Sequence, residues 1–237
     1  MRQDIFSPKV DLPVLGLFAL ALLTGILLYY IDLPTFSVYI EEDGVVEWLT
    51  VAALAACAVV CLMRYFRLKT QKKKLFSIAL LVMILVFIFA MGEELSWGQR
   101  IFKIQSSYFF ITHNTQQEIN IHNLQFGPVK INKLIFGLFL SIGFCLYLFV
   151  LPILYRIFKI IKQWVDDLAI PVPQNYQLIA YGALFIAIGI IHDPRKWELL
   201  EMGCVMLFLV ILNNPLNREI FKKIKDEEAA QTRSGSE

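Results

Sequence analysis

Long apolar stretches separated by short polar segments dominate the pattern of this chain. A helix crosses the hydrocarbon core of a bilayer with about 20 apolar residues, and six stretches reach or approach that length. The pattern predicts an all-α fold, a polytopic membrane helix bundle of about six transmembrane helices, as a single domain over residues 1–212. The predicted spans are 12–31, 45–63, 75–92, 131–155, 176–191 and 194–212, with an outer loop at 93–130 and a cytoplasmic polar tail at 213–237.

The positive charges predict the orientation of this bundle. Sixteen of the 22 lysines and arginines lie on one side, in the N-terminal segment, the loops 64–74 and 156–162, and the tail. Cationic loops stay in the cytoplasm, so an N-in/C-in topology is expected. The lysine run in 64–74 could be a nucleic-acid patch. Its place in an eleven-residue loop between two spans favours a topology signal, and no nucleic-acid partner is expected.

Composition agrees with the apolar pattern. Hydrophobic residues make up 57% of the 237 positions and charged residues 18%. Soluble domains average about 45–50% apolar residues, so a soluble globular protein and a disordered chain are both excluded. The four cysteines all fall inside predicted spans, where we expect buried small side chains rather than disulfides.

Ionisable side chains gather on the predicted outer side. Glu198 and Glu201 are three residues apart and share one face of the last span. Glu201 lies about 10 Å below the start of that helix, and a charged group at such depth is a functional hypothesis by default. The alternative is a structural pair with an arginine.

A second acidic position closes the third span. Glu93 and Glu94 stand at a helix C-terminus, where the helix dipole disfavours negative charge. Arg100 is the nearest cation in the sequence, and a structural ion pair is one interpretation of this segment. Glu47, in the first turn of the second span, is either part of the same site or a helix-capping residue.

The outer loop is rich in amides and carries two of the three histidines. Asn114, Glu118 and His122 are spaced by four residues and would share one face if the segment is helical. Glu118 and His122 could then share a metal ion, because carboxylate and imidazole both bind zinc. A solvated loop is the alternative.

The segment Gly92–Phe102, followed by Asn-Ile-His-Asn-Leu at 120–124, resembles a motif pair found in an uncharacterised family of bacterial multi-pass membrane proteins. The similarity covers about a third of the chain and implies no activity. It implies a bacterial membrane protein, most simply of the inner membrane. The orientation predicted from the positive charges would turn its polar site toward the periplasm or exterior.

The acidic stretch leading into Glu47-Trp48-Leu49-Thr50 is similar to the start of alkaline ceramidase-type membrane hydrolases. That resemblance implies a calcium ion held by the acidic stretch and a zinc ion held by three histidines and an aspartate; the chain has three histidines, and Asp193 or a glutamate could complete the set. The calcium-like ligands would be Glu41, Asp43 and Glu47, and the zinc-like ligands His122, His192, Asp193 and Glu94.

Three functions remain open on these residues. The first is a membrane-embedded, metal-dependent hydrolase or transferase that acts on a membrane lipid at the extracytoplasmic leaflet. A metal on His122, His192 and Glu94 would activate water, Glu198 or Glu201 would act as general base, and Arg100 would hold a phosphate or oxyanion. The second is an ion- or proton-coupled carrier. The third is a scaffold or assembly subunit that binds a protein partner or a second copy of the chain.

Overall fold

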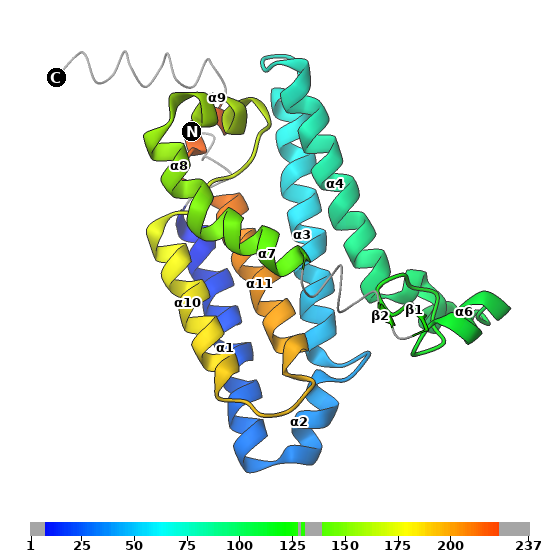
Figure 1. Ribbon diagram of the computed structural model, residues 1–237. Coiled ribbons are helices and arrows are strands. Elements are labelled where there is room, and N and C mark those ends of the chain that lie inside the picture. The colour runs from blue at the N-terminus through cyan, green and yellow to red at the C-terminus, as the bar shows by residue number, and fades with distance from the viewer. Residues whose placement is uncertain (1–7, 128, 131–138, 223–237) are drawn as a thin grey trace, which may run out of the picture.

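The structure is a computed structural model that describes residues 8–127, 129–130 and 139–222. Long helices run side by side through most of its height (Figure 1). Neighbouring pairs in this bundle are α3 with α4, α3 with α11, α1 with α11, and α10 with α11. The long helices are α1 (Pro8–Ile31), α3 (Val45–Leu68), α4 (Lys74–Glu94), α10 (Asn175–Gly189) and α11 (Lys196–Asn213).

The two ends of the bundle differ in the loops that they carry (Figure 1). We call one the acidic end and the other the basic end. The acidic end comprises the loops 41–44, 95–127 and 190–195, and the basic end comprises the loop 69–73, residues 158–174 and residues 214–222.

Four stretches are long and apolar enough to cross a membrane: Val10–Ile31, Leu33–Leu68, Lys74–Glu94 and Leu140–Ile157. At 1.5 Å per residue, about 20 helical residues match a hydrocarbon core of about 30 Å. The second stretch contains both α2 (Leu33–Ile40) and α3. The chain is thus mostly helical and has the elements of an integral membrane protein.

Some of the six predicted spans coincide with helices of the structure, and others agree with it only in part. The spans predicted at 12–31, 45–63 and 75–92 coincide with α1, α3 and α4. In the span at 131–155, residues 131–138 lie outside the described residues, and the rest forms three consecutive short helical elements. These are α7 (Leu140–Cys145), η3 (Leu146–Val150) and α8 (Leu151–Ile157).

The last two predicted spans are α10 and α11. Helix α10 is 15 residues long, which is short for a bilayer. Helix α11 has 18 residues but begins with Lys196, Glu198 and Glu201, so it is not among the four apolar stretches. Six spans and the N-in/C-in topology therefore stay predictions.

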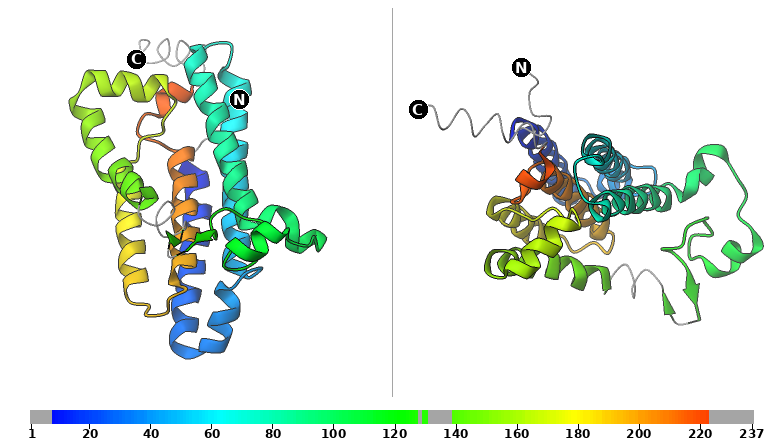
Figure 2. Two further views of the ribbon diagram at one scale, coloured as in Figure 1. Left: turned by 45° about the vertical axis from the view of Figure 1, so that its right-hand side comes forward. Right: turned by 90° about the horizontal axis from the view of Figure 1, so that it is seen from above.

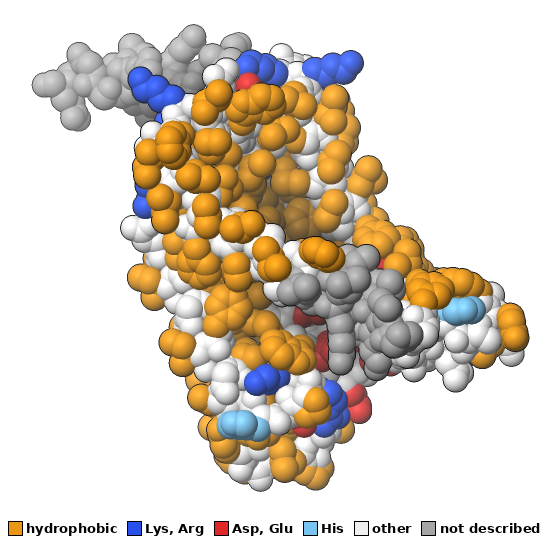
Figure 3. Space-filling model, viewed as in Figure 1, with side chains coloured by type: hydrophobic (Ala, Val, Ile, Leu, Met, Phe, Trp, Pro, Cys, Tyr) orange, Lys and Arg blue, Asp and Glu red, His pale blue; other side chains and the backbone are white. Residues whose placement is uncertain are grey.

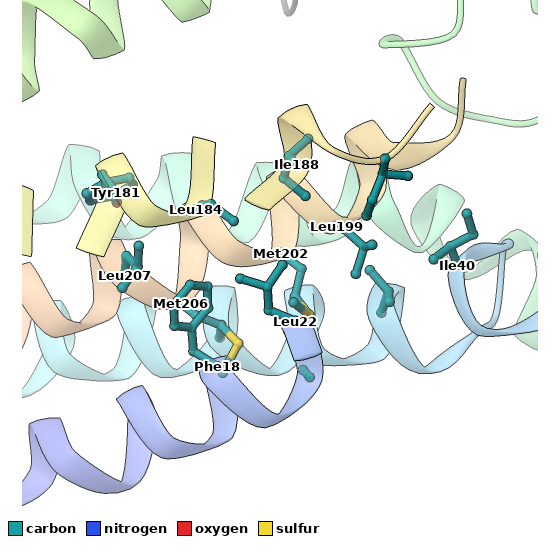
Figure 4. Packing of buried hydrophobic residues seen from close by; sticks show 14 of the residues in the cluster. Phe18, Leu22, Ile40, Tyr181, Leu184, Ile188, Leu199, Met202, Met206 and Leu207 are labelled. Carbon is teal, nitrogen blue, oxygen red and sulfur yellow. The ribbon is translucent and has the colours of Figure 1, made fainter. Parts of the chain in front are cut away.

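The core surrounds α11, whose apolar side chains meet α1 and α10 (Figure 4). Association of helices in lipid depends on close packing, because the surrounding chains are as apolar as the helices. Gly203 provides such an approach, since a Cβ there would lie 2.7 Å from the Leu184 side chain. The hydroxyl of buried Tyr181 donates to the Cys204 carbonyl at 2.8 Å, which satisfies the one polar atom at this contact.

Helix α3 extends beyond its predicted end at residue 63 and stops at Leu68. Arg64 is therefore helical and buried, although the sequence placed it in the cytoplasmic loop. Its guanidinium donates to the Leu212 carbonyl and lies 3.7 Å from the centre of the Phe221 ring. Arg64 joins α3 to the end of α11 instead of contributing to a basic surface.

Residues after α11 also pack against the bundle. Asn213, Asn214 and Asn217 are buried, and the short helix η4 (Arg218–Phe221) follows them. The predicted polar tail at 213–237 therefore begins with residues of the packed structure, and residues 223–237 lie outside the described residues.

Between α4 and α7 the chain extends sideways from the bundle (Figure 2). This outer loop contains η1 (Ser96–Gly98), α5 (Gln99–Phe102), α6 (Tyr108–His113), β1 (Gln125–Phe126) and β2 (Val129–Lys130). The two strands pair antiparallel, with Gln125 opposite Lys130. The rest of the loop is held by side-chain hydrogen bonds, which also shape the candidate site.

Candidate functional site

The chain leaves α4 through a left-handed turn at Ser96, Trp97 and Gly98, with φ angles of 45°, 53° and 79°. Residues with side chains rarely adopt this conformation, and it persists only where the surroundings impose it. Here Trp97 lies over Gly92, where a Cβ would come within 2.9 Å of the indole. After the turn the chain leaves the bundle sideways (Figure 2).

Glu93 connects the end of α4 to residues 121–122 of the outer loop. One carboxylate oxygen accepts from the Trp97 indole at 2.8 Å. The other accepts from the backbone amides of Ile121 and His122 at 2.7 and 2.9 Å, and His122 Nδ1 lies 3.4 Å away. Glu93, which the sequence paired with Arg100, is thus stabilised by amides and an indole instead.

Arg100 sits at the centre of four carboxyl groups. Its Nε lies 3.2 Å from Asp43, and Nη1 lies 3.2 Å from Glu118 and 3.7 Å from Glu42. Nη2 pairs with Glu47 and donates to the Glu94 carbonyl oxygen at 3.2 Å. Partial burial opposes the charge, but the Glu47 and Glu118 carboxylates outweigh it and raise the pKa of Arg100.

Glu47 also holds the turn before its own helix. Its second carboxylate oxygen accepts from the Asp43 backbone amide at 2.8 Å, one residue before the N-cap Gly44 of α3. The sequence offered capping and site membership as alternatives for Glu47; the structure places it in the first turn of α3 and beside Arg100.

A buried amide network supports Glu118 from the other side. Its carboxylate accepts from the Ser96 hydroxyl and from the Asn120 side chain at 3.1 Å. Asn120 also donates to Ser96 Oγ at 3.0 Å, and Asn114 donates to the Asn120 side chain at 2.8 Å. Asn114, Glu118 and His122 lie outside helices, so the predicted shared helix face is not formed.

Glu94, Glu198 and Glu201 form a second acidic group. The Glu94 carboxyl group lies close enough to the Glu201 carboxyl group to interact with it, and Glu198 adds its charge nearby. Among the described residues, no lysine or arginine forms an ion pair with any of these three. Acidic side chains are visible at the floor of a hollow on this side of the molecule (Figure 3).

The zinc-like ligands do not converge. His122 lies beside Glu93, whereas the backbone amide of His192 donates to the Tyr29 hydroxyl at 3.2 Å. Arg195 pairs with Asp193, and hydrogen bonds from Arg195 lower the pKa of Asp193. Within residues 8–127, 129–130 and 139–222, no group of three or more His, Cys, Asp or Glu side chains is placed to hold a metal ion.

The calcium-like ligands are likewise divided. Asp43 and Glu47 share Arg100 as their partner, and Glu41 is exposed in the turn between α2 and α3. An arginine therefore lies between the acids that the resemblance assigned to a cation.

Sequence reasoning missed a second polar cluster, at the basic end. The buried Asp11 carboxylate accepts from Asn213 at 2.6 Å, Asn214 at 3.1 Å and the Tyr176 hydroxyl at 2.9 Å. Gln177 donates to the Asn214 carbonyl at 3.0 Å. The sequence did carry one signal of this cluster: the consecutive asparagines Asn213 and Asn214 at the end of a long apolar run.

In comparisons with known proteins, no protein-family model, curated protein or solved structure matches this chain. The two resemblances noted in the sequence remain predictions.

Proposed function

We propose that the chain is an integral membrane hydrolase or transferase that acts on a lipid, with Glu94 and Glu201 as its acid–base pair. The contact between these two carboxyl groups at the acidic end carries the proposal. Two neighbouring carboxylates repel each other, so we expect a proton on one of them. The pair therefore offers one group that can donate a proton and one that can accept a proton.

The proposed chemistry follows from that arrangement. The ionised carboxylate accepts the proton of an attacking water or hydroxyl group as its oxygen forms a bond to the lipid's reacting centre. The protonated carboxyl group gives its proton to the leaving oxygen as that bond breaks. Glu198, on the same face of α11 as Glu201, strengthens the negative field that keeps a proton on the pair.

Arg100 takes a positioning role in this proposal. Asp43, Glu118, Glu47 and the Glu94 carbonyl occupy its donors, so it holds α3, α4 and the outer loop together. Its hydrogen bond to the Glu94 backbone fixes the residue that carries one half of the acid–base pair. This differs from the phosphate-binding role that the sequence suggested.

A lipid substrate fits the surroundings of the pair. The turns of α4 before Glu94 expose large apolar side chains, including Leu85, Val86 and Phe89. Apolar side chains cover much of this face of the molecule above the acidic hollow (Figure 3). A lipid lying in the bilayer would reach the pair with its head group while its acyl chains stay in the apolar layer.

The proposal includes the orientation predicted from charge. Six spans with both termini in the cytoplasm would place the acidic end outside the bacterial inner membrane. Reporter fusions after residues 105 and 222 test this part, with opposite sides expected. A cytoplasmic location for residue 105 would contradict it.

The activity is tested on protein reconstituted in vesicles of total polar lipid extract, with lipid composition followed by mass spectrometry. Wild type is expected to convert one lipid class, and Glu94→Gln and Glu201→Gln to slow conversion about 10²–10⁴-fold, as for loss of a general acid or base. Glu41→Gln is the matched control, because Glu41 is an exposed acid of the same end. No lipid conversion by wild type, or full activity in both variants, would overturn the proposal.

One observation favours a proton- or cation-coupled carrier as the second candidate. The Glu94–Glu201 pair lies near the start of α11 and the Asp11 cluster at its end, so both ends of one helix have carboxyl groups beside them. A carrier predicts flux into liposomes that is lost in Glu201→Gln and in Asp11→Asn. An enzyme predicts no flux and an Asp11→Asn variant that still converts lipid.

A further inference from the structure

Helix α9 (Lys159–Asp167) lies across the basic end, at a large angle to the long helices (Figure 2). Its inner face packs against the bundle through Val165, which is buried with Tyr155 and Val172. Ile160 and Trp164 are one turn apart and are 64% and 60% exposed. A short helix with this stripe of exposed apolar side chains is suited to the boundary between water and acyl chains.

Both acidic side chains of α9 are bonded to other parts of the protein. Asp166 accepts from the Tyr155 hydroxyl and from Asn217, each at 3.0 Å. Asp167 pairs with Lys73 of the neighbouring loop at 2.8 Å. The charges that α9 presents to its surroundings are therefore those of its exposed lysines, Lys159 and Lys162.

The loop next to α9 adds to this positive charge. It contributes Lys69, Lys72 and Lys74 at the same end of the bundle, where lysine and arginine side chains are visible in Figure 3. Basic residues beside a membrane surface attract anionic lipids, each raising the affinity about fivefold.

We propose that α9, the loop 69–73 and Lys74 at the start of α4 form a binding site for anionic phospholipids. Lys159 and Lys162 contact the phosphate of the head group, and Ile160 and Trp164 insert beside the first carbons of the acyl chains. The charge and the exposed apolar stripe together select a lipid over a soluble phosphate, which would meet only the lysines. This site is separate from the acidic pair and does not depend on the proposed reaction.

Trp164 provides a local probe, because the other three tryptophans, Trp48, Trp97 and Trp197, belong to the acidic end. The full chain is reconstituted in mixed phosphatidylcholine and phosphatidylglycerol vesicles, with bromine on the acyl chains of one lipid or the other. Quenching of Trp164 is the difference between wild type and Trp164→Phe. Trp164 is exposed, so its replacement leaves the packing of the bundle unchanged.

We expect brominated phosphatidylglycerol to quench Trp164 more strongly than brominated phosphatidylcholine at the same mole fraction. The Lys159→Gln/Lys162→Gln variant should lower this preference about fivefold per lysine, and high salt should weaken it. Lys103→Gln, an exposed lysine of the acidic end, should leave it unchanged. Three outcomes would overturn the proposal. Both brominated lipids could quench Trp164 equally, or the Trp164→Phe variant could be quenched as strongly as wild type. The double lysine variant could also keep the full preference for phosphatidylglycerol.

Discussion

The acidic and basic ends each contain a polar cluster, and the two clusters satisfy their carboxylates by different means. At the acidic end, Arg100 neutralises Glu47 and Glu118 directly. At the basic end, no cation is bonded to Asp11 among the described contacts, and its carboxylate is bound by two asparagines and a tyrosine. One cluster rests on charge pairing and the other on neutral hydrogen-bond donors.

This difference bears on function. Neutral donors bind both carboxylate oxygens of Asp11, which suits a contact that joins α1, α10 and α11. The acidic end holds more carboxyl groups than its one central arginine pairs with, and Glu94, Glu198 and Glu201 are among those that Arg100 leaves without an ion pair. Reactivity is expected where carboxyl groups remain in contact without a cation.

Among these substitutions, Arg100→Met is expected to lower the free energy of unfolding most. Removing one partner of a largely buried ion pair leaves uncompensated charge and costs about 3–5 kcal/mol. Unfolding in detergent by a denaturant titration measures this loss. Adding Glu47→Gln and Glu118→Gln should recover part of the stability, whereas a triple variant as unstable as Arg100→Met alone would argue against charge pairing.

Asp11→Asn should lower the free energy of unfolding by less, about 1–2 kcal/mol. The reason is that one donor among Asn213, Asn214 and Tyr176 then faces the amide hydrogens of the new side chain. The same unfolding measurement applies, with Asp167→Asn as an outward-lying control. A loss equal to that of Arg100→Met would remove the distinction between the two clusters.

The left-handed turn can be tested at Gly98, where φ is +79° and a Cβ would lie 3.1 Å from the Phe102 ring. Gly98→Ala should lower the free energy of unfolding by about 1–2 kcal/mol. Gly182→Ala is the control: it lies within α10 with no atom within 4 Å of the added Cβ and should be neutral or stabilising. Equal effects of both substitutions would contradict a strained turn.

The smallest effect is expected at the exposed pair between Lys73 and Asp167. Lys73→Ala should change stability by about 0.5 kcal/mol or less, and the difference should vanish at high salt. A larger, salt-independent loss would mean that the contact between α9 and the loop 69–73 carries more than an ion pair.

The sequence predicted the local features of the fold better than it predicted which side chains bind one another. The apolar runs of α1, α3 and α4 appear directly in the hydrophobic pattern, because span length depends on consecutive residues. The grouping of acids at one end followed from the same runs. These predictions required only knowledge of where each span begins and ends.

Partner choice depends on contacts between distant segments. Arg100 pairs with Glu47, 53 positions earlier, and not with Glu93, its near neighbour. Glu93 instead accepts from backbone amides, which no pattern of side chains reveals. Asp11 and Asn214, 203 positions apart, look like ordinary residues at the ends of two spans until α1 and α11 are packed together.

The most direct test of the central claim is infrared spectroscopy of the reconstituted protein near neutral pH. The account predicts a carbonyl band of a protonated carboxylic acid, sensitive to exchange into heavy water, that is lost in both Glu94→Gln and Glu201→Gln and kept in Glu41→Gln. A spectrum without that band, or a band unchanged in both variants, would contradict a proton shared between Glu94 and Glu201.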